Sequence, residues 1–157
     1  MRIGVYFCNC GTHISEKINA DSVRGKILHF HDDLIFQPVD FMCSEEGKEF
    51  IESDIKKNNI DRVVIAACSP REHEQTFMRV LSNAGVNPYL MQMVNIREQV
   101  AWVTEEKTEA TIKAARLLKD FPWLNRKRHL LSIRDPSGST VLRAKWNVPK
   151  KPIERWK

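Results

Sequence analysis

The segment at residues 63–71, V-V-I-A-A-C-S-P-R, constrains the fold more than any other part of the sequence. Its four leading apolar residues are small or branched and show no polar alternation, which predicts a strand buried on both faces. Ser69 and Pro70 are typical of the cap and first position of a helix, so Cys68 falls between a strand and a helix. Parallel sheets place their ligands at this point, and the helix N-terminus there stabilises a thiolate.

Strand and helix signals alternate through the first 120 residues. Strands are predicted at 2–7, 34–39, 62–67 and 88–94, and helices at 23–30, 45–58, 70–83 and along much of 96–118. Strands joined by helical crossovers pair in parallel. We therefore predict an α/β fold, a three-layer sandwich with a small parallel four-stranded sheet of flavodoxin-like or Rossmann-like type, in strand order 2-1-3-4.

Two helices carry particularly clear signals. Ser44, followed by two glutamates, predicts a capped start. The inner face of that helix is expected to carry Gly47, Phe50, Ile51 and Ile55. The next helix is expected to bury Phe77, Val80 and Leu81 and to end at Gly85.

The alternation ends near residue 120, which divides the chain into an α/β domain at 1–120 and an extended arm at 121–157. The arm contains ten Lys/Arg and two Asp/Glu, a formal charge of +8, which leaves −3 for the rest of a chain with net charge +5. Such an arm can bind nucleic acid, an anionic membrane or an acidic protein, or can stay solvated until a complex forms. The turn signal D-P-S-G at 135–138 predicts a hairpin-like or extended course. The arm's Trp123, Trp146 and Trp156 either meet a partner surface or pack back on their own domain.

Whether the cysteines form disulfides depends on the redox state of the compartment in which the protein resides. No apolar run approaches the roughly 20 residues of a bilayer span, and the first residues are too soon interrupted to form a secretory signal. We therefore expect a cytoplasmic protein with no membrane span. In that reducing compartment, four cysteines are expected to be reduced, metal-bound or catalytic rather than disulfide-bonded.

All four cysteines follow predicted strands. Cys8 and Cys10 follow the first strand, Cys43 the second and Cys68 the third. Neighbouring strands lie roughly 5 Å apart, so the four sulfurs can converge at one edge of the sheet. Four converging thiolates need a cation, which zinc or an iron–sulfur cluster would supply. The alternative is that these cysteines are buried small hydrophobes.

Several residues near the cysteines are candidates for a supporting role. Gly11 would let backbone amides approach the site, and the helices capped by Ser44 and Ser69 would direct N–H groups toward it. His13, Arg71 and His73 are either neighbours of the site or ordinary surface residues. Arg97 and Glu98 form either a structural ion pair or a docking element. No Ser/His/Asp grouping, P-loop or H-E-x-x-H motif is present, so no catalytic residue is assigned.

Four stretches resemble one known family. They are C-N-C-G-T-H-I, F-M-C-S-E-E-G, D-R-V-V-I-A-A-C-S-P-R-E-H-E-Q-T-F and N-P-Y-L-M-Q-M-V-N-I-R-E-Q-V-A-W-V, and they strongly resemble the N-terminal domain of the heterodisulfide reductase A subunit over residues 1 to about 120. The resemblance implies a [4Fe–4S] cluster held by Cys8, Cys10, Cys43 and Cys68. It also implies an electron-transfer module of a flavin-based bifurcating oxidoreductase complex.

The sequence departs from that family after residue 118. It has neither the G-x-G-x-x-G turn of a flavin domain nor a C-x-x-C-x-x-C ferredoxin run. FAD is therefore expected in a partner, and the expected partners are flavin- and iron–sulfur-containing subunits rather than nucleic acid. Our first hypothesis is a non-catalytic electron-relay subunit, and our second is a metal-stabilised or metal-free adaptor or assembly module. A flavodoxin-like FMN carrier is disfavoured because the first loop lacks a Ser/Thr-Gly-rich phosphate cradle.

Overall fold

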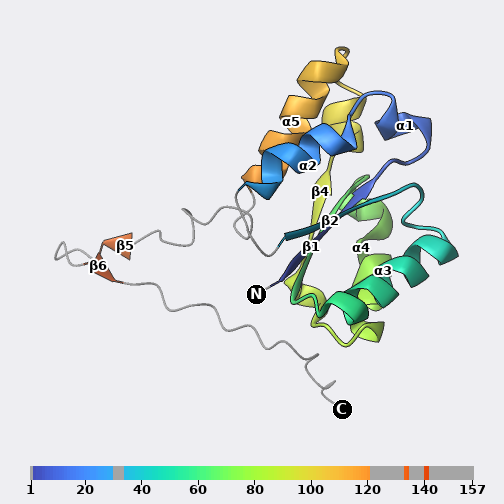
Figure 1. Ribbon diagram of the computed structural model, residues 1–157, viewed down its shortest axis with the longest axis vertical. Helices are drawn as coiled ribbons and strands as arrows, with labels where there is room; N and C mark the ends of the chain where they lie inside the picture. Colours follow the sequence, from blue (N-terminus) through green and yellow to red (C-terminus); the bar gives the residue numbers. More distant parts are fainter. Residues whose placement is uncertain (1, 30–33, 121–132, 135–139, 142–157) are drawn as a thin grey trace.

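A four-stranded parallel sheet forms the centre of the molecule (Figure 1). The computed structural model describes residues 2–29 and 34–120, together with the backbone of 133–134 and 140–141. The strands are β1 (Ile3–Cys8), β2 (Leu34–Val39), β3 (Arg62–Ala67) and β4 (Met91–Asn95), in the order β2-β1-β3-β4. The predicted strand order is therefore confirmed.

Helices cover both faces of this sheet, as Figure 1 shows. Helix α2 (Ala20–Leu28) packs beside α5 (Lys107–Lys119), and α3 (Glu45–Asn58) packs beside α4 (Pro70–Asn83). β1 is buried along its whole length and β3 is buried after its first residue, because the two central strands have helices on both sides. The predicted three-layer α/β architecture is confirmed.

The predicted helix starts are largely correct. The Ser44 side chain accepts a 3.1 Å hydrogen bond from the Gly47 N–H, and Ser69 accepts one of 3.4 Å from the Arg71 N–H. Helix α2 begins at Ala20, three residues before the predicted start at 23, because the Asn19 side chain caps it by accepting a 2.8 Å hydrogen bond from the Ser22 N–H. Each cap satisfies an N–H group that has no partner within its own helix.

One predicted core position on α3 is wrong. Phe50 is 41% exposed, whereas Ile51 and Ile55 are buried as expected. The remaining buried position belongs to Asp54, which accepts a hydrogen bond from Tyr6 beneath the helix. The three predicted core residues of α4, Phe77, Val80 and Leu81, are all buried.

The segments flanking β4 differ from the prediction. Pro88–Leu90 forms the 3₁₀ turn η1, because the Asn87 side chain accepts a hydrogen bond from the Tyr89 N–H, and the strand begins only at Met91. The helix expected along 96–118 is split into the π-helix η2 (Arg97–Ala101) and α5. A short helix, α1 (Thr12–Ser15), forms where no helix was predicted.

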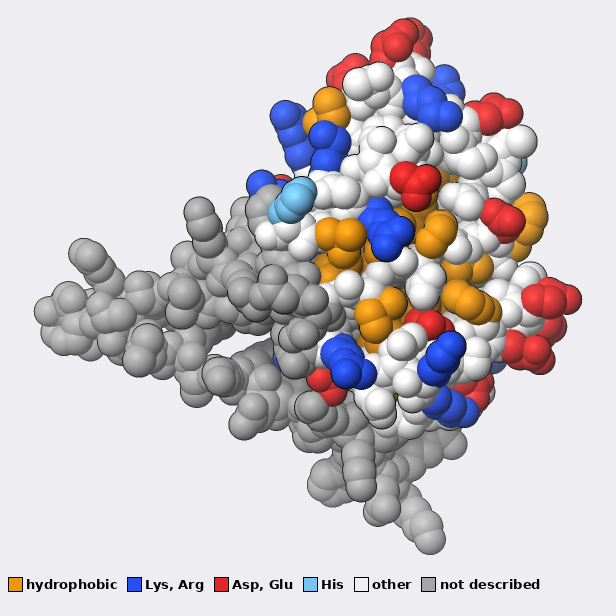
Figure 2. All heavy atoms as spheres, in the orientation of Figure 1, with side chains coloured by type: hydrophobic (Ala, Val, Ile, Leu, Met, Phe, Trp, Pro, Cys, Tyr) orange, Lys and Arg blue, Asp and Glu red, His pale blue; other side chains and the backbone are white. Residues whose placement is uncertain are grey.

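Only two short strands of the arm are described. β5 (Ile133–Arg134) pairs antiparallel with β6 (Thr140–Val141), and the two strands lie on either side of the D-P-S-G turn signal in the sequence. Trp123, Trp146 and Trp156 lie outside the described residues. Among the described helices, none is both long and apolar enough to cross a membrane. On the face of the molecule seen in Figure 2, acidic and basic side chains of the described part are interspersed.

Candidate functional site: a four-cysteine edge

The carboxyl edge of the sheet carries all four cysteines, which we call the cysteine edge: Cys8, Cys10, Cys43 and Cys68. Cys8 ends β1, Cys68 follows β3 directly, and Cys43 lies between β2 and the Ser44 cap. Because β1 lies between β2 and β3, the loops that carry these residues leave three adjacent strands. All four thiols are free of disulfides.

The cysteines differ in their exposure. Cys8 and Cys68 are 5% and 6% exposed, Cys10 is half-buried, and Cys43 is exposed. Across residues 2–29 and 34–120, no group of three or more His, Cys, Asp or Glu side chains has an arrangement that could hold a metal ion. The backbone therefore brings the four cysteine-bearing segments to one edge, but their side chains do not form a preassembled metal site.

The loop from β1 to α1 is tightly constrained. Cys10 and Gly11 both have positive φ angles, of 48° and 57°, which reverse the chain after the strand. A Cβ at Gly11 would also lie 3.2 Å from the ring of Phe41, so a larger residue would be both strained and crowded there. Gly11 is thus required by the turn itself.

Hydrogen bonds join this loop to the loop that carries Cys43. The Asn9 N–H donates to the Val39 carbonyl at 2.9 Å, and its side-chain amide donates to Asp40 Oδ1 at the same distance. The Cys8 thiol donates to the Asp40 carbonyl at 3.5 Å. The two loops therefore hold Cys8 and Cys43 in a fixed backbone relationship.

Gly47 fixes the Cys43 loop on the other side. A Cβ at Gly47 would overlap the Phe41 carbonyl and the Met42 backbone. Only glycine lets the first turn of α3 approach this loop so closely. The residues on either side of Cys43 are therefore packed against the start of α3, although the Cys43 side chain itself is exposed.

The buried thiols are shifted toward their neutral form. Burial raises the pKa of Cys8 to about 11; Cys10 and Cys43 add to this shift, and backbone hydrogen bonds from Met42 and Cys10 oppose it. Burial also raises the pKa of Cys68, where the charge of Arg97 opposes the shift and Glu98 and Cys10 reinforce it. Cys10 and Cys43 therefore lie near enough to Cys8, and Cys10 near enough to Cys68, to act on those thiols electrostatically. A bound cation would reverse these pKa shifts, because it favours thiolates.

Arg97 is the cationic residue that sequence reasoning did not connect with the cysteines. It begins η2, and its Nη1 lies 3.7 Å from the Cys10 Sγ. Burial opposes its charge, but hydrogen bonds to Glu98 and Cys10 outweigh that effect and raise its pKa above the ordinary value. One signal was available: the N-I-R-E-Q stretch follows β4 at the same edge where the cysteines lie.

The other predicted neighbours of the site lie as follows. Ser44 and Ser69 cap α3 and α4, so the first turns of both helices begin beside Cys43 and Cys68. Arg71 is exposed on the first turn of α4, and the His73 ring contacts Phe77 edge-on, with 6.4 Å between ring centroids. The exposed His13 ring lies edge-on to Trp102, with 6.3 Å between centroids.

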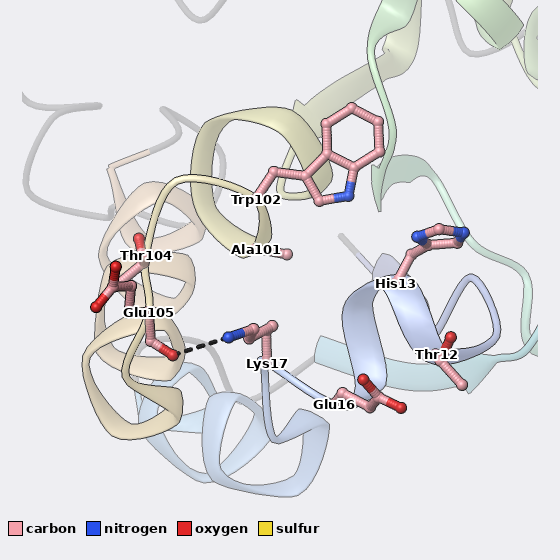
Figure 3. A pocket seen from close by; sticks show the side chains of 8 residues that line it. All are labelled: Thr12, His13, Glu16, Lys17, Ala101, Trp102, Thr104 and Glu105. Carbon is pink, nitrogen blue, oxygen red and sulfur yellow. Dashed lines mark hydrogen bonds between the residues drawn. The ribbon is translucent and has the colours of Figure 1, made fainter.

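A cleft of about 330 Å³ opens beside Trp102, between α1 and the segment that follows η2 (Figure 3). Figure 3 shows Trp102 and His13 on one side and the Lys17 ammonium donating to the Glu105 carbonyl at 3.0 Å on the other. None of the four cysteines lines it. The cleft borders the cysteine edge through His13 and Trp102 without being part of it.

Comparison with known proteins places this geometry in context. Over 120 residues, 76% of this chain, the sequence is 49% identical to the A subunit of the ferredoxin/F420H2-dependent CoB–CoM heterodisulfide reductase of Methanosarcina acetivorans. Over the same length it is 50% identical to the A subunit of the ferredoxin:CoB–CoM heterodisulfide reductase of Methanosarcina mazei. The matched part of the chain is homologous to the heterodisulfide reductase A subunit. The resemblance predicted from the four sequence stretches is thereby confirmed.

The homology to the heterodisulfide reductase A subunit covers only a small part of the larger proteins. The chain spans 15% of the length of both Methanosarcina relatives. The iron–sulfur A subunit of the CoB–CoM heterodisulfide reductase of Methanocaldococcus jannaschii is 37% identical over 118 residues, which are 74% of this chain and 18% of that protein. No protein-family model matches the sequence. The relatives are thus named as subunits of a reductase, and one of these three as its iron–sulfur subunit.

Proposed function

We propose that this chain is an electron-transfer module of a heterodisulfide reductase-like, flavin-dependent complex. In this proposal Cys8, Cys10, Cys43 and Cys68 hold one [4Fe–4S] cluster. The observation that carries the proposal is the strand order β2-β1-β3, which brings four cysteines from three loops to one edge of a sheet. The name of the Methanocaldococcus relative, an iron–sulfur subunit, supports the same chemistry.

The four cysteine thiols are suitable ligands for an iron–sulfur cluster. Four thiols without disulfides match the thiolate ligands that iron–sulfur clusters use. The Arg97 guanidinium and the first turns of α3 and α4 supply positive charge and N–H groups near those sulfurs. The described side chains do not form a ready-made metal-binding group, and Cys43 is the one exposed thiol of the four.

When bound, the cluster would supply one-electron transfer. The protein would hold it at the sheet edge, with the backbone of two hydrogen-bonded loops fixing Cys8, Cys10 and Cys43. Cys8 and Cys68 lie at the buried side, whereas Cys10 and Cys43 lie toward solvent. An electron would therefore reach a partner most directly past Cys43. The proposal places FAD in a partner subunit, the arm at 121–157 on that partner, and the complex in a reducing cytoplasm.

A second candidate function is a structural one. In this alternative the chain is an adaptor or assembly module of the complex, with zinc or no metal at the cysteine edge. Its metal-free form does not need the four thiols to gather, which agrees with the lack of a preassembled three-donor group among the described side chains. Zinc accepts four thiolates but carries no electrons.

Anaerobic purification of the full chain distinguishes the two functions. The electron-transfer proposal expects iron and sulfide at about four each per chain and a broad absorption near 400 nm that dithionite bleaches. One equivalent of zinc in a colourless protein would instead support the structural role. Cys68→Ser should lose the iron, because it removes one of four thiolates.

A matched control guards against a folding artefact. Ala84→Ser introduces the same side chain at a half-buried position at the end of α4, which leads back to the opposite edge of the sheet. It should retain the iron of the unmodified chain. If Cys68→Ser also retains the iron and the absorption, Cys68 is not a ligand and the four-cysteine centre is wrong.

A further inference from the structure

Arg97 is held at the cysteine edge by its backbone. The adjacent Ile96 N–H donates to the Ala67 carbonyl at 2.8 Å, which ties the residue before Arg97 to the end of β3 beside Cys68. The Glu98 N–H donates to Asn95 Oδ1 at 3.0 Å and fixes the following residue. The start of η2 is therefore anchored on both sides of Arg97.

The guanidinium is held on three sides. Its Nε and Nη2 donate to Glu98 Oε1 at 3.1 and 2.8 Å, and its Nη1 points to the Cys10 Sγ at 3.7 Å. The Trp102 ring lies beneath it, with 5.0 Å between the guanidinium carbon and the ring centroid. Arg97 keeps only 22% of its side chain exposed, so its charge is poorly screened by water.

Glu98 supplies an opposing charge at the same place. Its Oε2 is buried and has no hydrogen-bond partner among the residues that the structure describes. Arg97 and Glu98 both act electrostatically on Cys68, with opposite signs. Two neighbouring residues therefore place a positive and a negative charge against the sulfurs of Cys10 and Cys68.

We propose that Arg97 and Glu98 are positioning residues that set the reduction potential of the iron–sulfur centre in opposite directions. This inference rests on the proposed electron-transfer function. Reduction adds one negative charge to the centre, and a nearby cation with a hydrogen bond to a sulfur stabilises that state. Arg97 therefore raises the potential, and Glu98 lowers it while locking the guanidinium against Cys10.

The test compares midpoint potentials of the anaerobically purified full chain and its variants, monitored by visible absorption and electron paramagnetic resonance. Arg97→Gln should shift the midpoint to more negative values, and Glu98→Gln should shift it to more positive values. Arg97→Lys keeps the charge but loses the two-nitrogen contact to Glu98, so its midpoint should lie between those of Arg97→Gln and the unmodified chain. Arg24→Gln, an equal charge change on the exposed face of α2, should leave the midpoint unchanged.

The outcomes separate this inference from the function on which it rests. If the unmodified chain contains no iron, both the proposed function and this inference are overturned. An iron-loaded chain whose Arg97→Gln and Glu98→Gln variants have unchanged midpoints, or midpoints shifted in the same direction, overturns only the inference. If Arg97→Gln loses its iron, the midpoint potential of Glu98→Gln is the deciding measurement. A shift to more positive values supports the inference, and an unchanged or more negative midpoint overturns it.

Discussion

The hydroxyl of Tyr6 on β1 donates a 2.9 Å hydrogen bond to Oδ2 of Asp54 on α3. Tyr6 is fully buried and Asp54 is 8% exposed. The other carboxylate oxygen of Asp54 accepts a 2.8 Å hydrogen bond from the Asn58 side chain. A buried carboxylate is thus satisfied by one strand residue and one residue of its own helix, which explains how Asp54 occupies a core position.

Tyr6→Phe should destabilise the fold without affecting the cysteine edge. The change removes the donor and leaves Asp54 Oδ2 buried without it, at a cost of about 1–3 kcal/mol in the free energy of unfolding. Urea unfolding followed by circular dichroism measures this cost. A loss below a few tenths of a kcal/mol would mean that water replaces the hydroxyl and that the contact contributes little.

The same hydrogen bond predicts a loss of stability in alkali. Burial, followed by the charge and hydrogen bond of Asp54, raises the pKa of Tyr6 above its ordinary value of 10.0. The stability that this shift confers is complete below pH 10, where Tyr6 is neutral in both states. This stability is lost as the pH rises further, because the Tyr6 hydroxyl ionises readily only in the unfolded chain.

Comparison with Tyr6→Phe isolates this contribution. The variant should lose less stability than the unmodified chain as the pH rises above about 10, since cysteines and lysines titrate in both. Urea unfolding of the reduced, metal-free proteins at several pH values gives the slope of the free energy of unfolding against pH for each of the two chains. Equal slopes would show that Tyr6 does not contribute to the alkaline transition.

Gly47→Ala should disturb the loop that carries Cys43. The added Cβ meets the Phe41 carbonyl, so the loop or the first turn of α3 must move, at a cost of about 1–3 kcal/mol. Gly25→Ala is the matched control: its Cβ meets nothing within 4 Å inside α2, and it should stabilise by about 0.5–1 kcal/mol. Thermal unfolding and iron content of both variants test this, and a neutral Gly47→Ala would contradict the close approach.

Deletion of residues 122–157 should separate folding from assembly. The parallel sheet and the helices that cover it lie within residues 3–119, so the thermal unfolding of the shortened chain and its iron absorption should be unchanged. Binding to a purified flavin- and iron–sulfur-containing subunit should be lost. A truncated chain that still binds this subunit would show that the arm is not the docking element.

Local sequence was sufficient to predict the sheet. The strands at 34–39 and 62–67 have the predicted bounds, because their branched apolar residues end at strong turn or cap signals. Ser44 and Ser69 have the predicted cap roles for a similar reason: a cap is a contact between residues two or three positions apart. The family followed from whole stretches of sequence rather than from single residues.

Contacts between distant residues could not be predicted in the same way. An ion pair was one of two alternatives left open for Arg97 and Glu98, and they form it, at 2.8 Å. The contact from Arg97 to Cys10 joins residues 87 positions apart and has no local signal. Likewise, a π-helix that begins at Arg97 replaces the first part of the regular helix predicted along 96–118, and Val103, just beyond it, is 64% exposed.

The order of the strands has a consequence for how such a protein would be matured. β1 is made first but finds its place only when β2 and β3 have joined it on either side, and Arg97 arrives still later, after β4. The four cysteine-bearing segments are therefore brought to one edge only after β3 has been made, and Arg97 reaches that edge last. Under the proposed function, the cluster would be loaded only after this part of the chain has folded, and a cell short of iron would accumulate apoprotein whose exposed Cys43 is open to oxidation or to zinc.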